Sequence, residues 1–206
     1  MIHLNTEHKF RIIFFITGLY LFLFTIIAVM RRNEEFIYYS IIVLTIFFIL
    51  LKFRKKLYIS VSSMIGLSFA QMLHVLGINI HIARQRLYDI WIIHGYFRYD
   101  NLVHLLSMMV VTIAMYDIMK NYLHEKIHNN KIILSLILIL IVCGIGAFNE
   151  VMEFGAVLFF NAGAQVGDYT NNALDLVFNL LGALAGCIYL AIIIKKSNHR
   201  RDIRKV

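Results

Sequence analysis

Residues 148–186, FNEVMEFGAVLFFNAGAQVGDYTNNALDLVFNLLGALAG, decide how the rest of the chain is interpreted. The stretch lies among long apolar runs and holds four of the chain's 12 acidic residues: Glu150, Glu153, Asp168 and Asp175. A carboxylate at membrane depth costs several kcal/mol unless it is paired, hydrated or bound to a metal. The stretch therefore predicts a polar functional site within a membrane protein.

The composition of the whole chain indicates an integral membrane protein. Of its 206 residues, 60% are hydrophobic and 16% are charged, with a mean hydropathy of +0.74. Soluble domains carry about 25% charged residues. The net charge of +8 does not predict nucleic-acid binding, because the Lys and Arg residues flank apolar runs instead of forming a soluble basic domain. Cys143 and Cys187 lie inside apolar runs without CxxC spacing, so neither a disulfide framework nor a thiolate metal site is expected.

Six apolar segments are long enough to cross a bilayer. They cover about residues 12–30, 36–51, 57–80, 102–119, 132–150 and 173–194. The segment 81–101 between the third and fourth is rich in aromatic residues and histidine, and it is expected at the membrane interface. The sequence thus predicts an all-α fold, a polytopic transmembrane helical bundle that forms one integral membrane domain over residues 1–206.

The distribution of basic residues predicts the orientation of this bundle. Regions that alternate along the chain place 15 Lys and Arg residues on one side of the membrane and five on the other. The more basic side, which includes both termini, faces the cytoplasm by the positive-inside rule. We therefore expect a multi-pass protein of the plasma (inner) membrane, with the acidic stretch near its outer face.

Acidic and histidine side chains from three predicted helices converge at that outer face. Asp100 and His104 are four residues apart, and Glu150 and Glu153 are three apart, so each pair shares one helix face. Asp175 lies near the outer end of the last predicted span. Carboxylates grouped with an imidazole are typical ligands of a divalent cation, which would also offset the repulsion between the acids.

These spacings predict a set of site residues and one cofactor. The cofactor is a divalent metal ion of unspecified identity. The expected metal ligands are Asp100, His104, Glu150 and Asp175, with Asp168 as a further candidate. The expected catalytic acid–base groups are Glu150, Glu153 and Asp175.

Simpler roles compete with each of these assignments. Asp100 can cap the fourth helix, His104 can be a satisfied interior histidine, and the two glutamates can be hydrated interfacial acids. Asp117 is interpreted as a solvated helix end. A stripe of polar and small residues on the sixth span predicts close helix packing, either within the chain or in a dimer. Its members are Asn171, Asp175, Asn179, Gly182 and Gly186, of which the last three are expected to serve packing.

Short motifs at these positions resemble a known family. Residues 99–104 (YDNLVH), 150–154 (EVMEF), 167–169 (GDY) and 175–179 (DLVFN) resemble the YjdF-like inner-membrane proteins. The order D-x3-H, membrane-end Glu and D-x3-N-x2-G-x3-G is also similar to VanZ-like proteins, which often have Gln where this chain has Glu153. The match covers residues 74–186. It implies a small polytopic membrane protein, and the VanZ-like similarity implies a link to the cell envelope.

Three classes of function are compatible with these features. The first is a metal-dependent enzyme that acts on a lipid or cell-envelope intermediate. The second is a small proton- or cation-coupled transporter that uses the same acids. The third is a non-catalytic envelope or interaction protein in which the cluster holds helices together. The expected partners are the lipid bilayer and, in the first class, a lipid-derived or envelope-derived substrate.

Overall fold

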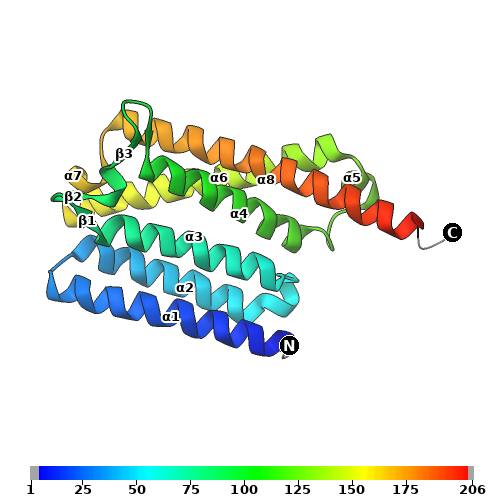
Figure 1. Cartoon of the computed structure of the whole chain (residues 1–206), viewed down its shortest axis with the longest axis horizontal. Coiled ribbons are helices and arrows are strands. Elements are labelled where there is room, and N and C mark those ends of the chain that lie inside the picture. Colours follow the sequence, from blue (N-terminus) through cyan, green and yellow to red (C-terminus); the bar gives the residue numbers. More distant parts are fainter. Residues whose placement is uncertain (1–4, 204–206) are drawn as a thin grey trace.

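The structure, a computed structural model that describes residues 5–203, is built around long helices that run back and forth along one axis (Figure 1). Six helices in this described part of the chain are long and apolar enough to cross a membrane. They are α1 (Thr6–Met30), α2 (Glu34–Leu57), α3 (Val61–Asn79), α4 (Tyr99–Met119), α6 (Lys131–Phe160) and α8 (Tyr169–Ile203). The predicted all-α bundle of six spans is confirmed.

The segment 81–101 folds into two small antiparallel hairpins. The first pairs β1 (His81–Ile82) with β2 (Gln85–Arg86), and the second pairs β3 (Trp91–Ile93) with β4 (Phe97–Arg98). The 3-10 helix η1 (Leu87–Asp89) joins them. In Figure 1 both hairpins lie at the end of the bundle where α4 begins, opposite the start of α1 and the end of α8. That the segment 81–101 lies at the membrane interface stays a prediction.

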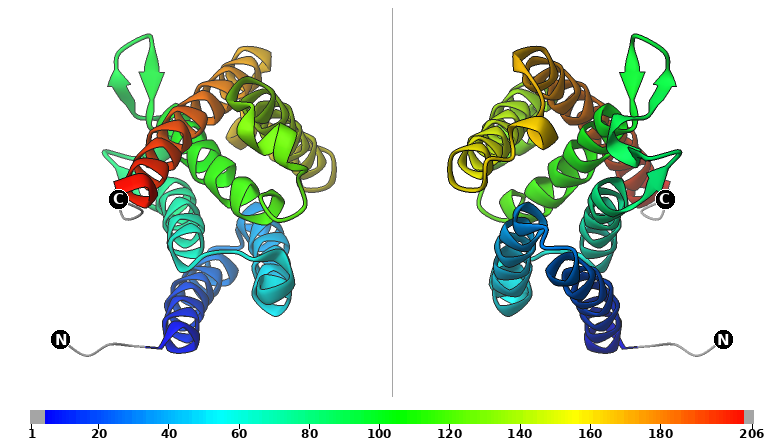
Figure 2. Two further views of the ribbon diagram at one scale, coloured as in Figure 1. Left: turned by 90° about the vertical axis from the view of Figure 1, so that its right-hand side faces the viewer. Right: turned by 90° about the vertical axis from the view of Figure 1, so that its left-hand side faces the viewer.

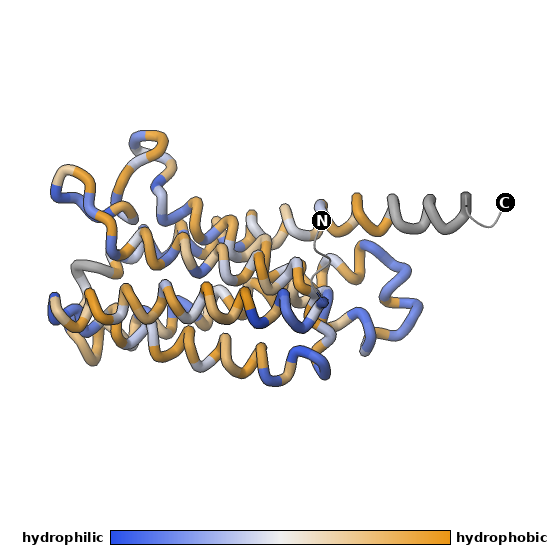
Figure 3. Tube along the Cα trace, turned by 60° about the horizontal axis from the view of Figure 1, so that its bottom comes forward, coloured by the Kyte–Doolittle hydropathy of each residue, from blue (hydrophilic) through white to orange (hydrophobic). Residues whose placement is uncertain are grey.

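Two further helices are short. α5 (Glu125–Asn129) precedes α6 at the end of the bundle opposite the hairpins, and α7 (Gly163–Val166) lies between α6 and α8. Figure 3 shows hydrophilic residues gathered at the two ends of the bundle and apolar residues along the helices between them. This distribution is the one that a bilayer favours.

Several helices extend beyond the predicted spans, and two of these extensions lie at the end of a span next to charged residues. The fifth span was expected to end at Glu150, but α6 continues for ten residues to Phe160, and Asn161 closes it in the left-handed conformation (φ 54°). Residues 151–160 contain no helix breaker beyond one glycine, so the helix has no reason to stop at the acid. The second span likewise continues past Leu51 to Leu57, because Lys and Arg are good helix formers.

The helices form two packed groups. Leu21 of α1, Phe36 of α2 and Val75 of α3 make one buried cluster, and Leu138 of α6 packs with Leu190 of α8 in another. Figure 2 shows α1–α3 on one side of α4, with α6 and α8 on the other. Extensive contact between α3 and α4 joins the groups. α4 is therefore the central element, and residues on it can contact both groups.

Apolar side chains also cover the outside of the bundle. Phe15 of α1 is 68% exposed, Leu140 of α6 is 65% exposed and Phe159 is 76% exposed. Large apolar residues at such exposure are costly in water but not in hydrocarbon. The outer surface is therefore suited to lipid.

Glycines allow the closest helix pairing in the bundle, between α4 and α8. A Cβ added at Gly182 would overlap the carbonyl oxygen of Leu105, and one at Gly186 would lie 2.9 Å from the carbonyl oxygen of Met109. The stripe of small residues on α8 thus packs against α4 of the same chain. The sequence left open whether this stripe packs within the chain or in a dimer, and in the structure it packs within the chain.

Asp117 forms a polar contact at the opposite end of the bundle. The interpretation of this residue as a solvated helix end is wrong, because its side chain is buried (7% exposed). Its Oδ2 accepts hydrogen bonds from the Ser63 hydroxyl (2.6 Å) and the Ser60 backbone N–H (3.1 Å), and its Oδ1 pairs with Lys120 Nζ (2.7 Å). The carboxylate satisfies free N–H groups at the start of α3 and complements the helix dipole there.

Replacing Asp117 by alanine is expected to destabilise the contact between α3 and α4. The Ser63 hydroxyl and the Ser60 N–H would lose their acceptor, which costs about 1–3 kcal/mol. Thermal unfolding in detergent measures the effect, with Glu125→Ala as the control because this acid is exposed and lies outside the contact. Equal stability of the two variants would contradict a structural role for Asp117.

Candidate functional site

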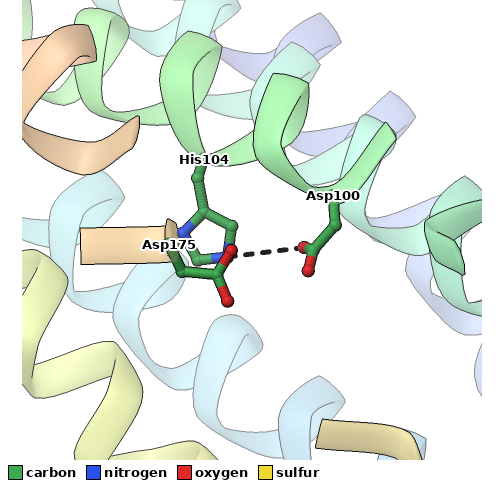
Figure 4. Close-up of side chains that lie close together, drawn as sticks. All are labelled: Asp100, His104 and Asp175. Atoms are coloured by element: carbon green, nitrogen blue, oxygen red, sulfur yellow. Dashed lines mark ion pairs between the residues drawn. The ribbon is translucent and has the colours of Figure 1, made fainter. Parts of the chain in front are cut away.

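His104 lies at the centre of the polar site. Its Nε2 is 3.5 Å from Asp100 Oδ1, one turn earlier on α4, and 3.8 Å from Asp175 Oδ1 on α8. Figure 4 shows the imidazole directed toward both carboxylates. The side chains of His104 and Asp175 are 3% and 1% exposed, and that of Asp100 is 15% exposed. The structure thus brings together three of the predicted ligands.

Asparagine side chains hold these groups in place. His104 Nδ1 lies 3.0 Å from Asn179 Oδ1, so the Nδ1–H donates to this oxygen and leaves Nε2 directed at the acids. Asn171 Nδ2 donates to Asp175 Oδ2 (2.9 Å), and Asn101 Nδ2 donates to Asp175 Oδ1 (3.4 Å). Each amide lies on α4 or α8, so the tight pairing of these helices also aligns the site.

The two predicted glutamates approach His104 from α6. Ligand atoms of His104, Glu150 and Glu153 lie within 4.8 Å of one another, as do those of Asp100, His104 and Asp175. Glu153 Oε1 accepts a hydrogen bond from Asn149 Nδ2 (2.8 Å). Both carboxylate oxygens of Glu150 are buried, and neither has a hydrogen-bond partner of normal geometry among the described residues.

The site lies inside the bundle rather than on its surface. His104 is five residues into α4, Asp175 is six residues into α8, and Glu150 is ten residues before the end of α6. At a rise of about 1.5 Å per residue these positions are roughly 8–15 Å from the helix ends. Because α6 extends past Glu150, this acid is deeper than the expected end of the span.

The donor set fits a divalent cation chemically. A histidine nitrogen with several carboxylate oxygens suits Zn²⁺ when few ligands bind and Mn²⁺ or Mg²⁺ when oxygens dominate. The Nδ1–H of His104 donates to an amide oxygen, which is the usual way in which a second contact orients a metal-binding histidine. The oxygens of Glu150, which have no hydrogen bond of normal geometry among the described residues, could also act as ligands.

The family of the chain is shown by its sequence. The family described as "Predicted membrane protein (DUF2238)" matches residues 11–196. The chain belongs to this family. The resemblance to YjdF-like proteins is thereby confirmed, because they constitute DUF2238, whereas the similarity to VanZ-like proteins stays a prediction. No curated protein and no solved structure matches the chain.

Membership of DUF2238 supports a membrane protein and assigns no reaction. The match covers most of α1, the whole of α2, α3, α4 and α6, and α8 as far as residue 196. The functional argument therefore depends on the site itself.

Two predicted roles differ in the structure. Asp168 is exposed, and its Oδ1 accepts a hydrogen bond from the Asn171 backbone N–H (2.9 Å), so it caps α8 and lies outside both candidate ligand groups. Asp100 does not cap α4, because Asn101 Oδ1 accepts the Arg98 N–H at that helix start (3.0 Å). The capping role belongs to Asn101.

Some residues of the site were not predicted from the sequence. Asn101, Asn149 and Arg98 contact the candidate ligands or their partners. An asparagine in or next to an apolar run is a signal that the sequence does offer, since amides at membrane depth need hydrogen-bond partners. Arg98 gives no comparable signal, because it lies in the mixed segment 81–101 where basic residues are ordinary.

A cavity of about 250 Å³ adjoins the acids. Asp100 and Glu153 are on its wall, which α2, α3, α4 and α6 form together with the segment 85–98 and the start of α8. Tyr88 of η1 also lines it and hydrogen-bonds to His74 Nδ1. Burial, and next the carboxylate of Asp100, raises the pKa of Tyr88 well above its ordinary value. Tyr88 therefore stays protonated and donates to His74.

Proposed function

We propose that the protein is a metal-dependent enzyme of the plasma membrane that acts on a lipid or cell-envelope intermediate at the outer face. The observation that carries the proposal is the position of Glu150 beside His104: both of its carboxylate oxygens are buried, and neither has a hydrogen-bond partner of normal geometry among the described residues. A buried carboxylate left unpaired is strongly destabilising on its own. A cation bound by Glu150 and His104 would remove that penalty.

The same observation argues against a purely structural cluster. Asp175 is fully engaged by Asn101 and Asn171, as expected of a group that holds α4 and α8 together. Glu150 holds nothing by comparison, and replacing it with an apolar residue would stabilise a merely structural bundle. Its position beside His104 and Glu153, the second of which lines the cavity, favours a binding role.

The arrangement assigns distinct roles to the residues. Asp100, His104, Glu150 and Asp175 would hold the metal, and a bound divalent ion supplies an activated water and polarises a phosphate or ester oxygen. Glu153 lines the cavity and belongs to one of the two candidate ligand groups. It would therefore be able to move a proton between the water and the leaving group. Asn179 positions His104 through Nδ1.

A transporter is less well supported. A conduction path needs polar groups across the midplane. Two mid-span hydroxyls are already paired: Thr112 Oγ1 donates to the Met108 carbonyl (2.7 Å), and Thr17 pairs with Ser68 (2.5 Å). The Ser107 hydroxyl has no partner among the described residues, but one such group does not make a path. The acids at one end and Asp117 at the other form separate networks.

Metal content of the purified, detergent-solubilised protein tests the proposal. The wild type, supplied with Zn²⁺, Mn²⁺ or Mg²⁺ and desalted, is expected to retain close to one ion per chain. His104→Ala and Glu150→Gln are expected to lose it, because each removes a ligand. The matched controls are His94→Ala and Glu125→Gln, whose exposed side chains lie away from the site.

The result decides between the functional classes. An ion that is retained by the controls and lost by both site variants supports the proposal and directs assays to hydrolysis of lipid headgroups. A wild type that retains no divalent ion after loading would refute the metalloenzyme proposal.

A further inference from the structure

The cavity beside the acids has one apolar wall and one polar wall. Phe36 and Val43 of α2, with Val75 and Ile78 of α3, form the mainly apolar side, whose polar members are Ser40, Gln71 and His74. Arg86, Arg98 and Asn171 lie on the polar side, where the hairpins and the start of α8 meet. The apolar wall lies on spanning helices, whereas both arginines lie in the segment outside them. This is the arrangement that an amphiphile needs.

The two arginines differ in what they bind. Arg86 forms a two-point ion pair with Asp89, through Nε (2.9 Å) and Nη2 (3.0 Å). Arg98 has no carboxylate partner among the described side chains: its Nη1 donates to Asn171 Oδ1 (3.2 Å), and its guanidinium lies 4.3 Å from the centre of the Trp91 ring. Its Nε is buried and lacks an acceptor. Arg98 is thus held by an amide and an indole ring, with no carboxylate at ion-pair distance among the described residues.

A second unsatisfied donor lines the same cavity from the α2 side. Ser40 of α2 is 3% exposed and lines the cavity, yet its hydroxyl has no partner among the described residues. Buried hydroxyls are normally paired, so an isolated one facing a cavity indicates a ligand with an acceptor oxygen. The cavity therefore offers a cationic donor on the polar side and a neutral donor on the α2 side.

We propose that this cavity binds a lipid through its phosphate headgroup, with Arg98 on the phosphate, Ser40 on a second oxygen and the chain along the α2–α3 wall. The proposal rests on the proposed function, because it names the substrate class of the same site. A planar guanidinium matches phosphate oxygens in two-point geometry. A volume of about 250 Å³ is at the small end for ligand sites, so the headgroup would fit while the acyl chains stay in the bilayer.

Fluorescence of Trp91 provides the test, because it is the chain's single tryptophan and stacks on Arg98. The solubilised full-length protein is titrated with dihexanoyl phosphatidic acid, dihexanoylglycerol and inorganic phosphate, before and after metal removal with a chelator. Of the three ligands, only dihexanoyl phosphatidic acid is expected to cause a saturable change in Trp91 fluorescence. Arg98→Gln and Ser40→Ala are expected to weaken binding, by about tenfold or more for the arginine.

Three variants separate a loss of lipid binding from a loss of folding. Arg84→Gln changes an exposed arginine of the neighbouring hairpin and should bind like the wild type. Arg98→Lys keeps the charge without the two-point geometry and should bind with intermediate affinity. Ser40→Ala removes no existing hydrogen bond, so weaker binding in that variant cannot be attributed to misfolding.

The outcomes distinguish this inference from the proposed function. Equal binding of dihexanoylglycerol, or no loss in Arg98→Gln, would overturn the lipid phosphate site even if the protein binds metal. Inorganic phosphate binding as tightly as the lipid would overturn the role of the apolar wall. Selective lipid binding in a protein that retains no metal would uphold the site and refute the metalloenzyme.

Discussion

Gly182→Val is expected to prevent stable association of α4 with α8. Even the first carbon of the new side chain would overlap the carbonyl oxygen of Leu105 and lie 3.0 Å from Met108 Cβ. Backbone cannot move aside as a flexible side chain can, so the helices must separate, and overpacking of this kind costs about 1–3 kcal/mol or more. The loss should appear as a fall in the unfolding midpoint in SDS and in recovery of folded protein.

Gly144→Ala is the matched control for this change. Gly144 is also within a spanning helix, but a Cβ there meets nothing within 4 Å. Alanine is the better helix former, so stability should be unchanged or slightly higher. Should Gly182→Ala prove as stable as Gly144→Ala, the close contact between α4 and α8 would be refuted.

Divalent metal is expected to raise the unfolding temperature of the wild type, and Asp175→Asn to abolish that rise. An ion present at about 100 times its Kd stabilises the folded state by about 2.7 kcal/mol. Asp175 is a candidate ligand in contact with His104, and asparagine keeps its shape while removing the charge that attracts the ion. Differential scanning fluorimetry with and without chelator measures both proteins.

Asp168→Asn is the control for the loss of one carboxylate from the same region. Asp168 caps α8 from an exposed position outside the ligand groups, and asparagine is an equally good cap. Its response to metal should match that of the wild type. A metal response that survives in Asp175→Asn would remove this residue from the ligand set.

The number of spans could be predicted from the sequence because hydropathy is a property of each segment alone. Their ends could not, since Glu150 looked like the boundary of an apolar run while α6 continues to Phe160. A single acid does not stop a helix whose next turns remain apolar and helix-forming. The side of the membrane on which the termini lie remains a prediction from the count of basic residues.

The candidate site could be predicted in part. Spacings of three and four residues place Asp100 with His104 and Glu150 with Glu153, because helix geometry alone decides such neighbours. Which pairs face one another depends on how the helices cross. That crossing brings Asp175 to His104 and excludes Asp168, which lies seven residues earlier at the start of α8.

The sequence by itself thus determined a six-span helical bundle with acids and histidine toward one end, since periodicity and hydropathy are local. Only the tertiary structure decided the contacts between elements distant along the chain. It turned Asp117 into a buried cap and Asn179 into the partner of His104, and it left Glu150, Arg98 and Ser40 with unsatisfied polar atoms. Whether a buried polar group has a partner depends on packing between helices, which no single segment encodes.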